Sequence, residues 1–541
     1  MKRVITILIM LSLCYIGTAY AAGTVLETTF YSPALAKECS VQVYLPDGYD
    51  PMGGTEYPTI YFLHGALDNH MGYPYLLGVF DMLIENQIIE PVIVIKPDAR
   101  SYPFLVSWYT NSLYNGFFED YIVNDLIDFT ETNYCVVPDR GSRYVMGHSA
   151  GGYGSMTLGL KHPDLYSRLA AHSGALELNV MMVVALPALL SEYTGPPYIW
   201  NPMAGFFSGV FFSLGAAFSP NFTNPPFYVD LPLDENAVII QPIWQLWLQH
   251  NPPLFAAGLP QNADLAIYFD CGTMDEMGCY PQNLVFADAL AQLGIDHVFQ
   301  SYVGDHFTQL PERFSISIVF LVGLKAAIEF QPTTLNLKSN GNWVTCHIQL
   351  PGDYSAADID PSTVVLNKIN GVTLDPPIPR EGPYAIGNHG GRPCLMVKFS
   401  REALIDELYT MGICGEGVEL GVAGELTSRI PFHDCGLMDV IGTGGPQGSE
   451  MAGKNGYFLY QSTPNPFKTT TAIKYEVPKA TRVKISVYNA IGQRVATLVD
   501  AQQEAGTYSI TWEAKNLANG VYICRMEAGG NTKNQKMLLL K

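Results

Sequence analysis

An α/β domain built on a parallel sheet, followed by two all-β sandwich-like domains, is the architecture that the sequence predicts. Strand-like and helix-like segments alternate from about residue 57 to residue 160, which is typical of a parallel sheet with helices on both faces. Short strands with alternating apolar and polar residues replace this pattern after residue 331. A chain of 541 residues is also too long for one ordinary hydrophobic core.

The N-terminal residues predict export. Lys2 and Arg3 precede an apolar run from Val4 to Ile16, and small residues end at Ala22, so residues 1–22 fit a secretory signal peptide. The apolar run is too short for a membrane anchor. We therefore expect a secreted or cell-surface protein that passes through the periplasm.

The charge of the chain separates its last segment from the rest. The formal net charge is -20, which argues against nucleic acid as a partner. Residues 457–541 contain eleven Lys and Arg residues against five Asp and Glu residues, a net charge of +6. This segment is therefore expected to be a separate unit with its own role.

The first domain is expected over residues 23–330. Residues 39–50 suggest an edge strand, 57–63 and 91–98 suggest buried strands, and 120–134 suggest an amphipathic helix. Residues 178–262 interrupt the pattern, because they are rich in Pro, Phe, Trp and Gly and have almost no charge between Thr194 and Val229. We interpret this insertion as a cap over the site, and an oligomer interface is the alternative.

The turn Gly147-His148-Ser149-Ala150-Gly151 matches the G-x-S-x-G pattern between a strand and a helix. Such a turn presents the serine hydroxyl at a helix N-terminus, where free N–H groups favour negative charge. Gly147 and Gly151 are needed because strand and helix pass closely. Ser149 is therefore a candidate nucleophile.

Candidate oxyanion donors follow an earlier strand. The apolar run from Tyr57 leads into His64-Gly65-Ala66, and Gly65 allows the backbone to approach a substrate. We expect the N–H groups of Ala66 and Ala150 to hold the oxyanion. His64 is interpreted as a residue that shapes this loop.

Two further strands end at candidate partners for the serine. Asp275 follows the strand that begins at Asp264, and His306 follows the strand at 297–303. The order Ser149, Asp275, His306 is that of the α/β-hydrolases, with His306 as base and Asp275 orienting it. The rival carboxylates are Asp270, Asp305 and Glu276, of which Glu276 is the strongest alternative.

Nine cysteines remain after the expected signal peptide, and export permits disulfides. Cys271 and Cys279 bracket Asp275, so we hypothesise a disulfide that braces the acid loop; two unrelated thiols are the alternative. No cysteine or histidine spacing supports a metal site, and no cofactor is predicted.

These motifs resemble the esterase family that includes feruloyl esterases, S-formylglutathione hydrolases and mycolyltransferases. The resemblance extends from Thr24 to about Phe330 and implies the triad Ser149, Asp275 and His306. The long insertion departs from that family. The resemblance rests on Val43–Pro46, Leu63–Gly65, Gly147–Gly154, His162–Asp164, Ser173–Gly174, Gly272–Asp275 and Gly304–His306.

Two smaller domains are expected after the first. Residues 331–440 suggest a β-sandwich that acts as a spacer, with carbohydrate binding as the alternative, and 441–456 suggest a glycine-rich linker. Residues 457–541 contain Pro464-Asn465-Pro466-Phe467, Tyr488-Asn489-Ala490-Ile491-Gly492 and Gly520-Val521-Tyr522, which resemble the C-terminal sorting domain of type IX secretion substrates. That resemblance implies the outer-membrane secretion machinery as a partner.

The leading hypothesis is an exported serine esterase that forms an acyl-enzyme with an external ester, such as acyl or feruloyl groups on polysaccharide. An acyltransferase with a sugar hydroxyl as acceptor would use the same triad. A non-enzymatic surface-binding protein with a vestigial hydrolase fold is the third hypothesis. The acyl group, the oligomeric state and the fate of the last domain do not follow from the sequence.

Overall fold

The structure is a computed structural model that describes residues 23–104, 106–260, 263–339, 341–442, 458–459, 462, 465, 467–489, 493–515, 517–529 and 531–539. The predicted signal peptide and residues 443–456 of the predicted linker lie outside these ranges. The chain divides into two compact units. The first unit contains the described residues up to Lys325 together with the short segment Leu426–Pro431. The second unit contains Ala326–Glu425 and the described residues from Phe432 onward. The boundaries predicted from sequence within the second unit stay predictions.

The first unit is built on an eight-stranded sheet with the order β1-β2-β4-β3-β7-β8-β9-β10. All pairs from β4 to β10 are parallel, whereas β1 and β2 pair antiparallel with their neighbours. The strands are β1 (Thr24–Ser32), β2 (Lys37–Leu45), β3 (Thr59–Leu63), β4 (Ile93–Pro97), β7 (Arg143–His148), β8 (Arg168–His172), β9 (Ala266–Gly272) and β10 (Val298–Tyr302).

The predicted α/β character is confirmed, with one correction at the edge. The predicted edge strand at Cys39 is β2, the second strand, because β1 adds outside it. Most residues of β1 are exposed to solvent, as expected for an edge strand that pairs with only one neighbouring strand. Strands β3, β4 and β7 are buried throughout, as central parallel strands require.

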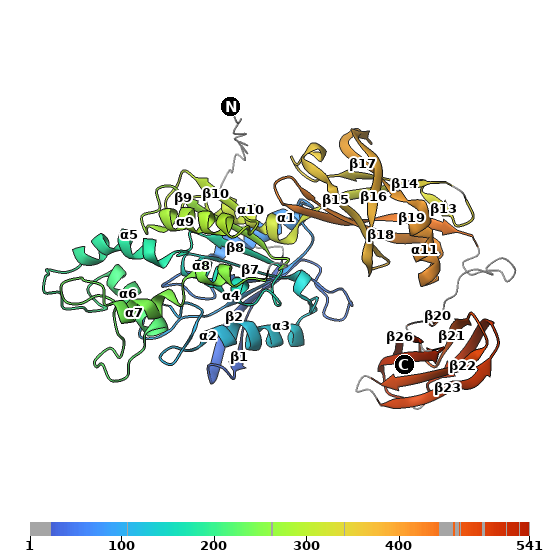
Figure 1. Cartoon of the computed structure of the whole chain (residues 1–541), viewed down its shortest axis with the longest axis horizontal. Helices are drawn as coiled ribbons and strands as arrows, with labels where there is room; N and C mark the ends of the chain where they lie inside the picture. The colour runs from blue at the N-terminus through green and yellow to red at the C-terminus, as the bar shows by residue number, and fades with distance from the viewer. Residues whose placement is uncertain are drawn as a thin grey trace. The chain divides into compact units, whose positions relative to one another are not determined.

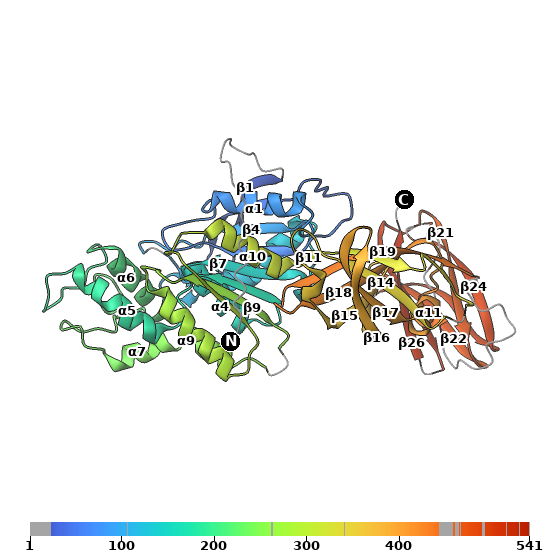
Figure 2. The ribbon, with the colours of Figure 1, turned by 90° about the horizontal axis from the view of Figure 1, so that it is seen from above.

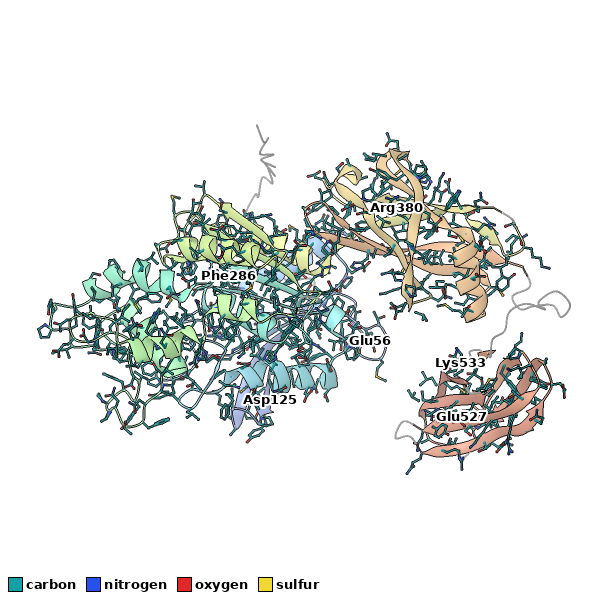
Figure 3. All side chains as sticks on the ribbon, in the orientation of Figure 1. Glu56, Asp125, Phe286, Arg380, Glu527 and Lys533 are labelled. Carbon is teal, nitrogen blue, oxygen red and sulfur yellow. The ribbon has the colours of Figure 1, made fainter. Side chains whose placement is uncertain are left out.

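Helices cover both faces of this sheet. Figure 2 shows α1 and α10 on one face and α4 and α9 on the other. Phe286 of α9, labelled in Figure 3, is fully buried and packs its ring 5.3 Å from that of Phe269 in β9. The helices are α1 (Pro74–Glu85), α2 (Phe118–Asp120), the π-helical turn η1 (Tyr121–Asp125), α3 (Leu126–Asn133), the 3₁₀ turn η2 (Arg140–Ser142), α4 (Ala150–Lys161), α9 (Cys279–Gln292) and α10 (Leu310–Val322).

The insertion at 178–262 contains four helices: α5 (Leu178–Ser191), α6 (Phe206–Phe218), α7 (Gln241–Leu248) and α8 (Pro252–Ala257). Figure 1 and Figure 2 both show α5, α6 and α7 grouped at one end of the first unit. Their apolar residues, among them Phe211, Phe218 and Trp247, join the core of that unit. A small hairpin of β5 (Asn111–Ser112) and β6 (Gly116–Phe117) and the short β11 (Leu324–Lys325) complete it.

Residues from Ala326 to Gly442 form strands, as expected, and also a helix that was not expected. Helix α11 (Arg401–Met411) begins after Ser400, whose hydroxyl accepts the N–H of Ala403, and ends at Gly412 in a left-handed conformation. Strand β16 pairs with β15 through its first half and with β17 through its second, so it joins two halves of one sheet. A two-sandwich arrangement stays a prediction. The elements are β12 (Ala327–Gln331), β13 (Thr334–Asn336), β14 (Trp343–Gln349), the 3₁₀ turn η3 (Ala356–Asp358), β15 (Ile359–Ile369), β16 (Val372–His389), β17 (Arg392–Ser400), β18 (Gly415–Leu426) and β19 (Pro431–Ile441).

The C-terminal segment contains a three-stranded sheet, β20-β21-β24, and a four-stranded sheet, β23-β22-β25-β26. Inward residues of both sheets, such as Tyr475 and Trp512 from the first and Ile485 and Met526 from the second, form one core. The strands are β20 (Phe458–Leu459), β21 (Thr470–Val477), β22 (Thr481–Asn489), β23 (Arg494–Gln503), β24 (Gly506–Glu513), β25 (Gly520–Ala528) and β26 (Asn531–Leu539). No helix in the described part of the chain is both long and apolar enough to cross a membrane.

Candidate active site

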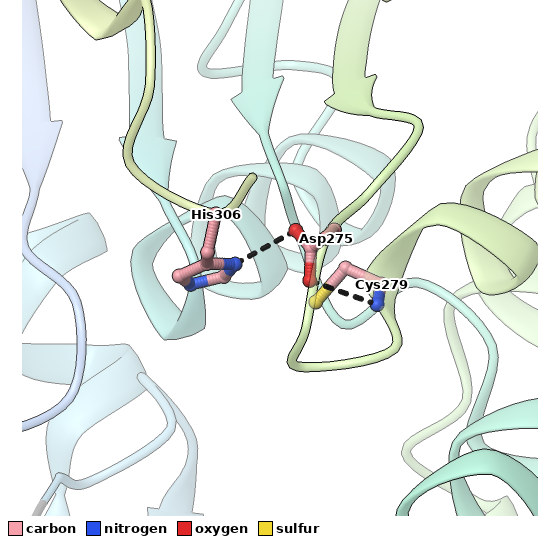
Figure 4. A group of neighbouring side chains, drawn as sticks. All are labelled: Asp275, Cys279 and His306. Carbon is pink, nitrogen blue, oxygen red and sulfur yellow. Dashed lines mark hydrogen bonds and ion pairs between the residues drawn. The ribbon is translucent and has the colours of Figure 1, made fainter. Parts of the chain in front are cut away.

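His306 and Asp275 form a hydrogen-bonded pair. Nδ1 of His306 lies 2.8 Å from Oδ2 of Asp275 (Figure 4). The two residues follow β10 and β9, which are parallel neighbours whose last paired residues are Tyr302 and Gly272. Because parallel strands end at the same edge of a sheet, the loops after them bring the two side chains together.

The Asp275 carboxylate is buried and ionised. Burial alone would raise the pKa of Asp275, but the hydrogen bond and charge of His306 and the N–H of Cys279 hold it below its ordinary value. Its Oδ1 accepts the N–H groups of Met277 at 2.9 Å and Cys279 at 3.3 Å. An ionised carboxylate only accepts, so Nδ1 of His306 carries the proton, and Nε2 of the neutral ring keeps its lone pair.

Ser149 stands in a strained turn between β7 and α4. Its φ of 59° and ψ of -120° are unusual for a residue with a side chain, and its N–H donates to the carbonyl of His172 at 2.9 Å. Every other residue from 143 to 160 is buried, whereas Ser149 is partly exposed. The fold therefore presents this one side chain to solvent.

The two motif glycines are required by close backbone contacts. A Cβ at Gly147 would lie 2.2 Å from the carbonyl oxygen of Gly151, and a Cβ at Gly151 would lie 1.9 Å from that of Leu63. Real Cβ atoms do not approach backbone oxygens so closely. Glycine at both positions lets the end of β3, the serine turn and the start of α4 pass in contact.

The loop after β3 passes beside the serine. A Cβ at Gly65 would lie 3.3 Å from Cβ of Ser149, which places the following residue, Ala66, at the same edge of the sheet. Ala150 is the first residue of α4. Among the residues that the structure describes, the N–H groups of Ala66 and Ala150 have no protein acceptor. Both are therefore available to an oxygen atom of a substrate.

His148 connects the serine turn to the histidine loop. Its Nε2 lies 2.9 Å from the carbonyl oxygen of His306, and the two rings are 4.7 Å apart between centroids. A carbonyl only accepts, so Nε2 carries the proton and Nδ1 accepts the hydroxyl of Tyr73 at 2.8 Å. Burial, followed by the charge of His306, lowers the pKa of His148 to about 3, so the ring is neutral.

No hydrogen bond joins Ser149 directly to His306 within the described part of the chain. The contact between the serine turn and the histidine loop runs through His148 instead. Sequence reasoning did not find His148 or Tyr73 as positioning residues. The position before the serine was a usable signal for His148, whereas nothing local marks Tyr73.

The rival acidic residues have other contacts. Glu276 accepts the backbone N–H of His306 at 3.0 Å and so holds the loop rather than the ring. Asp305 is exposed and bonds to Phe307 and Thr308. His64 is buried, and both of its ring nitrogens form hydrogen bonds with the backbone. Nδ1 lies 2.8 Å from the carbonyl oxygen of Gly65, and Nε2 accepts the N–H of Ala99 at 2.9 Å, as expected for a residue that shapes the loop.

Asp270 belongs to a buried ionic network beneath the site. Its carboxylate accepts hydrogen bonds from Nδ1 of His172 and Nε of Arg313, both at 2.9 Å, and from the hydroxyl of Tyr268 at 2.7 Å. The hydroxyl oxygen of Ser317 lies 2.9 Å from Nε2 of His172. Burial would raise the pKa of Asp270, but His172 and Arg313 lower it to about 2. The carbonyl of His172 accepts the N–H of Ser149, so this network fixes the strand that holds the serine turn.

The hypothesis of a Cys271–Cys279 disulfide is wrong. Both residues are free thiols. Sγ of Cys271 lies 3.4 Å from Oδ2 of Asp275, so this thiol donates to the carboxylate instead of pairing with Cys279. Burial raises the pKa of both thiols.

Apolar side chains are exposed beside the candidate residues. Leu67, Met274 and Phe307 each follow or precede a candidate residue in sequence and are 65%, 62% and 59% exposed. From the insertion, α5 lies against the acid loop, because a Cβ at Gly278 would lie 2.6 Å from Cγ2 of Val184. The interpretation of residues 178–262 as a cap stays a prediction.

One group of side chains could hold a metal ion. Ligand atoms of Asp275, Cys279 and His306 all lie within 4.8 Å of one another, and no other such group occurs among the described residues. The sequence did not predict this group, because its three residues come from two separate loops and the start of a helix and do not form a short spacing motif.

Comparison with known proteins identifies two segments. Residues 32–307 match the family described as "Putative esterase", which is more than half of the chain, and residues 463–540 match the "Secretion system C-terminal sorting domain". An esterase of Mycobacterium tuberculosis is 27% identical over 155 residues, which are 28% of this chain and 32% of that protein. An endo-1,4-beta-xylanase/feruloyl esterase of Xylanibacter ruminicola is 27% identical over 159 residues, 28% of this chain and 22% of that protein. The chain thus covers a third or less of these relatives.

Two solved structures are similar to part of this chain. A ferulic acid esterase matches with a TM-score of 0.39 and 17% identity, over 56% of this chain and 96% of that one. An S-formylglutathione hydrolase from Staphylococcus aureus matches with a TM-score of 0.39 and 19% identity, over 56% of this chain and 99% of that one.

Proposed function

Because the chain belongs to the "Putative esterase" family, whose match spans residues 32–307, we propose that it is an exported serine carboxylesterase. Residues 463–540 are a secretion-system sorting domain, so the chain is secreted to the cell surface and interacts with the secretion machinery. The observation that carries the proposal is the 2.8 Å pairing of His306 with the buried Asp275 carboxylate, at the sheet edge where Ser149 is partly exposed.

In the first half of the reaction, Oγ of Ser149 attacks the ester carbonyl carbon while its proton moves to Nε2 of His306. The ionised Asp275 stabilises the imidazolium through Nδ1–H. The N–H groups of Ala66 and Ala150 bind the oxyanion. Collapse of the tetrahedral intermediate breaks the ester C–O bond, and Nε2–H gives its proton to the departing alcohol.

In the second half, water attacks the acyl-enzyme while Nε2 of His306 takes its proton. The second tetrahedral intermediate uses the same two N–H groups. Its collapse breaks the bond between the acyl carbon and Oγ of Ser149, releases the carboxylic acid and returns the proton from Nε2 to Oγ. The neutral His148 keeps the His306 carbonyl in place throughout, because its Nε2–H donates to that oxygen. No step requires a metal ion or another cofactor.

For the substrate, we propose a neutral ester with an apolar part, such as an acyl or feruloyl group on external polysaccharide. Exposed Leu67, Met274 and Phe307 offer apolar contacts beside the candidate residues. The side chains of Asp305 and Glu276 near His306 are acidic, which disfavours an anionic acyl group. Two of the similar proteins are named feruloyl esterase and acetyl esterase.

The test is a screen of purified protein against aryl esters of graded acyl size, from acetyl to feruloyl, with and without an acceptor sugar. We expect hydrolysis by the wild type and no measurable hydrolysis by Ser149→Ala. Acylated sugar in place of free acid would identify an acyltransferase. No turnover of any ester would contradict the proposal and favour a binding protein.

A further inference from the structure

The thiol of Cys279 has no role in the proposed reaction, although it lies at the acid end of the site. Cys279 begins α9, and its side chain is 5% exposed. Its sulfur, an Asp275 carboxylate oxygen and a ring nitrogen of His306 lie within 4.8 Å of one another. Figure 4 shows the His306 ring and the thiol both next to the Asp275 carboxylate.

These three groups are the ligand types that bind zinc-like ions. Thiolate, imidazole and carboxylate bind Zn²⁺ at about 2.0–2.3 Å, which places tetrahedral ligand atoms roughly 3–4 Å apart. Side-chain shifts of about 1 Å would bring the three atoms to that spacing. Cys271, whose Sγ lies 3.4 Å from Asp275 Oδ2, is a second thiol beside this carboxylate.

The acid loop also gives an ion a route to these ligands. Thr273, Met274 and Glu276 are exposed on the turn that carries Asp275. The turn is held by short backbone contacts, such as Gly278 N–H to the Asp275 carbonyl at 3.2 Å, rather than by a disulfide. An ion can therefore enter from solvent by a local movement of residues 273–278.

We propose that Asp275, Cys279 and His306 form an inhibitory site for a thiophilic divalent cation, with Zn²⁺ as the probe ion. The inhibition rests on the proposed function, whereas the binding does not. The ion replaces the thiol proton of Cys279, which passes to solvent, and it binds Nδ1 of His306, so the single proton of the neutral ring moves through solvent to Nε2. The ring then loses its hydrogen bond to Asp275 and carries a bound cation, so it no longer takes the proton of Ser149.

The first experiment measures ester hydrolysis by untagged full-length protein against buffered free Zn²⁺. We expect reversible inhibition that EDTA relieves. Cys279→Ser and Cys279→Ala, each compared with its own rate without metal, should need at least about tenfold more Zn²⁺ for half-inhibition. The matched control is Cys39→Ser, which removes a buried thiol in β2, separated from β9 by four strands of the sheet, and should respond like the wild type.

The second experiment is independent of activity. Co²⁺ added to Ser149→Ala should give the visible bands of a tetrahedral site with a thiolate charge-transfer band, and Cys279→Ala in that background should lose the charge-transfer band. Equal Zn²⁺ inhibition of wild type and both Cys279 variants would overturn the proposal. Absence of a Cys279-dependent Co²⁺ spectrum would overturn it as well, even if the protein hydrolysed no ester.

Discussion

At the scale of single residues, the Asp275 and Glu276 contacts assign different roles to neighbouring carboxylates. Asp275 contacts the His306 ring, whereas Glu276 contacts the His306 backbone. Asp275→Asn should lower kcat by about 10³–10⁴-fold, because an amide favours the wrong tautomer of the ring. Glu276→Gln should change kcat little, since the amide oxygen still accepts the N–H. Steady-state kinetics on one ester decide the matter, and a dead Glu276→Gln beside an active Asp275→Asn would reverse the assignment.

The candidate residues could be predicted from sequence where local patterns mark them. Ser149 lies in a five-residue turn motif, and Asp275 and His306 each follow a predicted strand. These three residues can therefore be chosen as candidates from local sequence patterns. The contacts of Tyr73 with His148 and of His172 with Asp270 join residues that are far apart in the chain. Such pairs depend on the sheet order, which no local pattern specifies. The free state of Cys271 and Cys279 likewise depends on where their sulfur atoms point.

At the scale of elements, the packing of the serine turn against β3 is the contact that tolerates least change. Gly151→Ala would place Cβ 1.9 Å from the Leu63 carbonyl oxygen, so we expect loss of soluble protein or of nearly all activity. Gly78 of α1 is the matched control, because a Cβ there would meet nothing within 4 Å. Gly78→Ala should stabilise α1 by up to about 1 kcal/mol. Thermal unfolding and activity of both variants give the comparison, and a fully active, stable Gly151→Ala would contradict the packing.

The strands and helices of the first unit could be predicted because buried parallel strands are short apolar runs between amphipathic helices. The edge strand β1 was missed because its exposed, alternating residues carry a weak signal. Helix α11 was missed among strands for a similar reason, since its start is marked only by the Ser400 cap. Helix α6 of the insertion lacks a clear amphipathic period, because it is buried almost all round.

At the scale of the whole molecule, buried neutral histidines predict acid sensitivity. Burial lowers the pKa of His148 to about 3 and of His250 to about 4, and it lowers that of His64. Unfolded histidine binds a proton below about pH 6.5. Between that pH and the folded pKa the unfolded state binds more protons, so the free energy of unfolding falls as pH falls.

Denaturant unfolding at pH 7 and pH 5 measures this effect. The wild type should be less stable at pH 5, and His250→Gln should lose less stability between the two values. His250 suits the test because its ring stacks on that of Phe218, with the two ring centroids 4.3 Å apart. Equal losses in wild type and variant would show that His250 does not contribute.

The sorting domain predicts a separation of export from catalysis. The match at residues 463–540 has its own core, formed by two small sheets. A chain truncated after Gly445 should keep its ester hydrolysis and accumulate in the periplasm instead of reaching the surface. Cell fractionation with an activity assay of each fraction provides the measurement, and surface delivery of the truncated chain would refute the role of this domain.

The most direct test of the account is covalent labelling of the nucleophile. A fluorophosphonate probe reacts with an activated serine, and peptide mapping by mass spectrometry locates the adduct. In the wild type, we predict one adduct, on Ser149, that forms as ester hydrolysis is lost. Ser149→Ala should form no adduct, and its kcat should be lower by about 10⁴-fold or more. An adduct on another residue that abolishes activity, or hydrolysis by Ser149→Ala at the wild-type rate, would contradict the assignment of Ser149 as nucleophile.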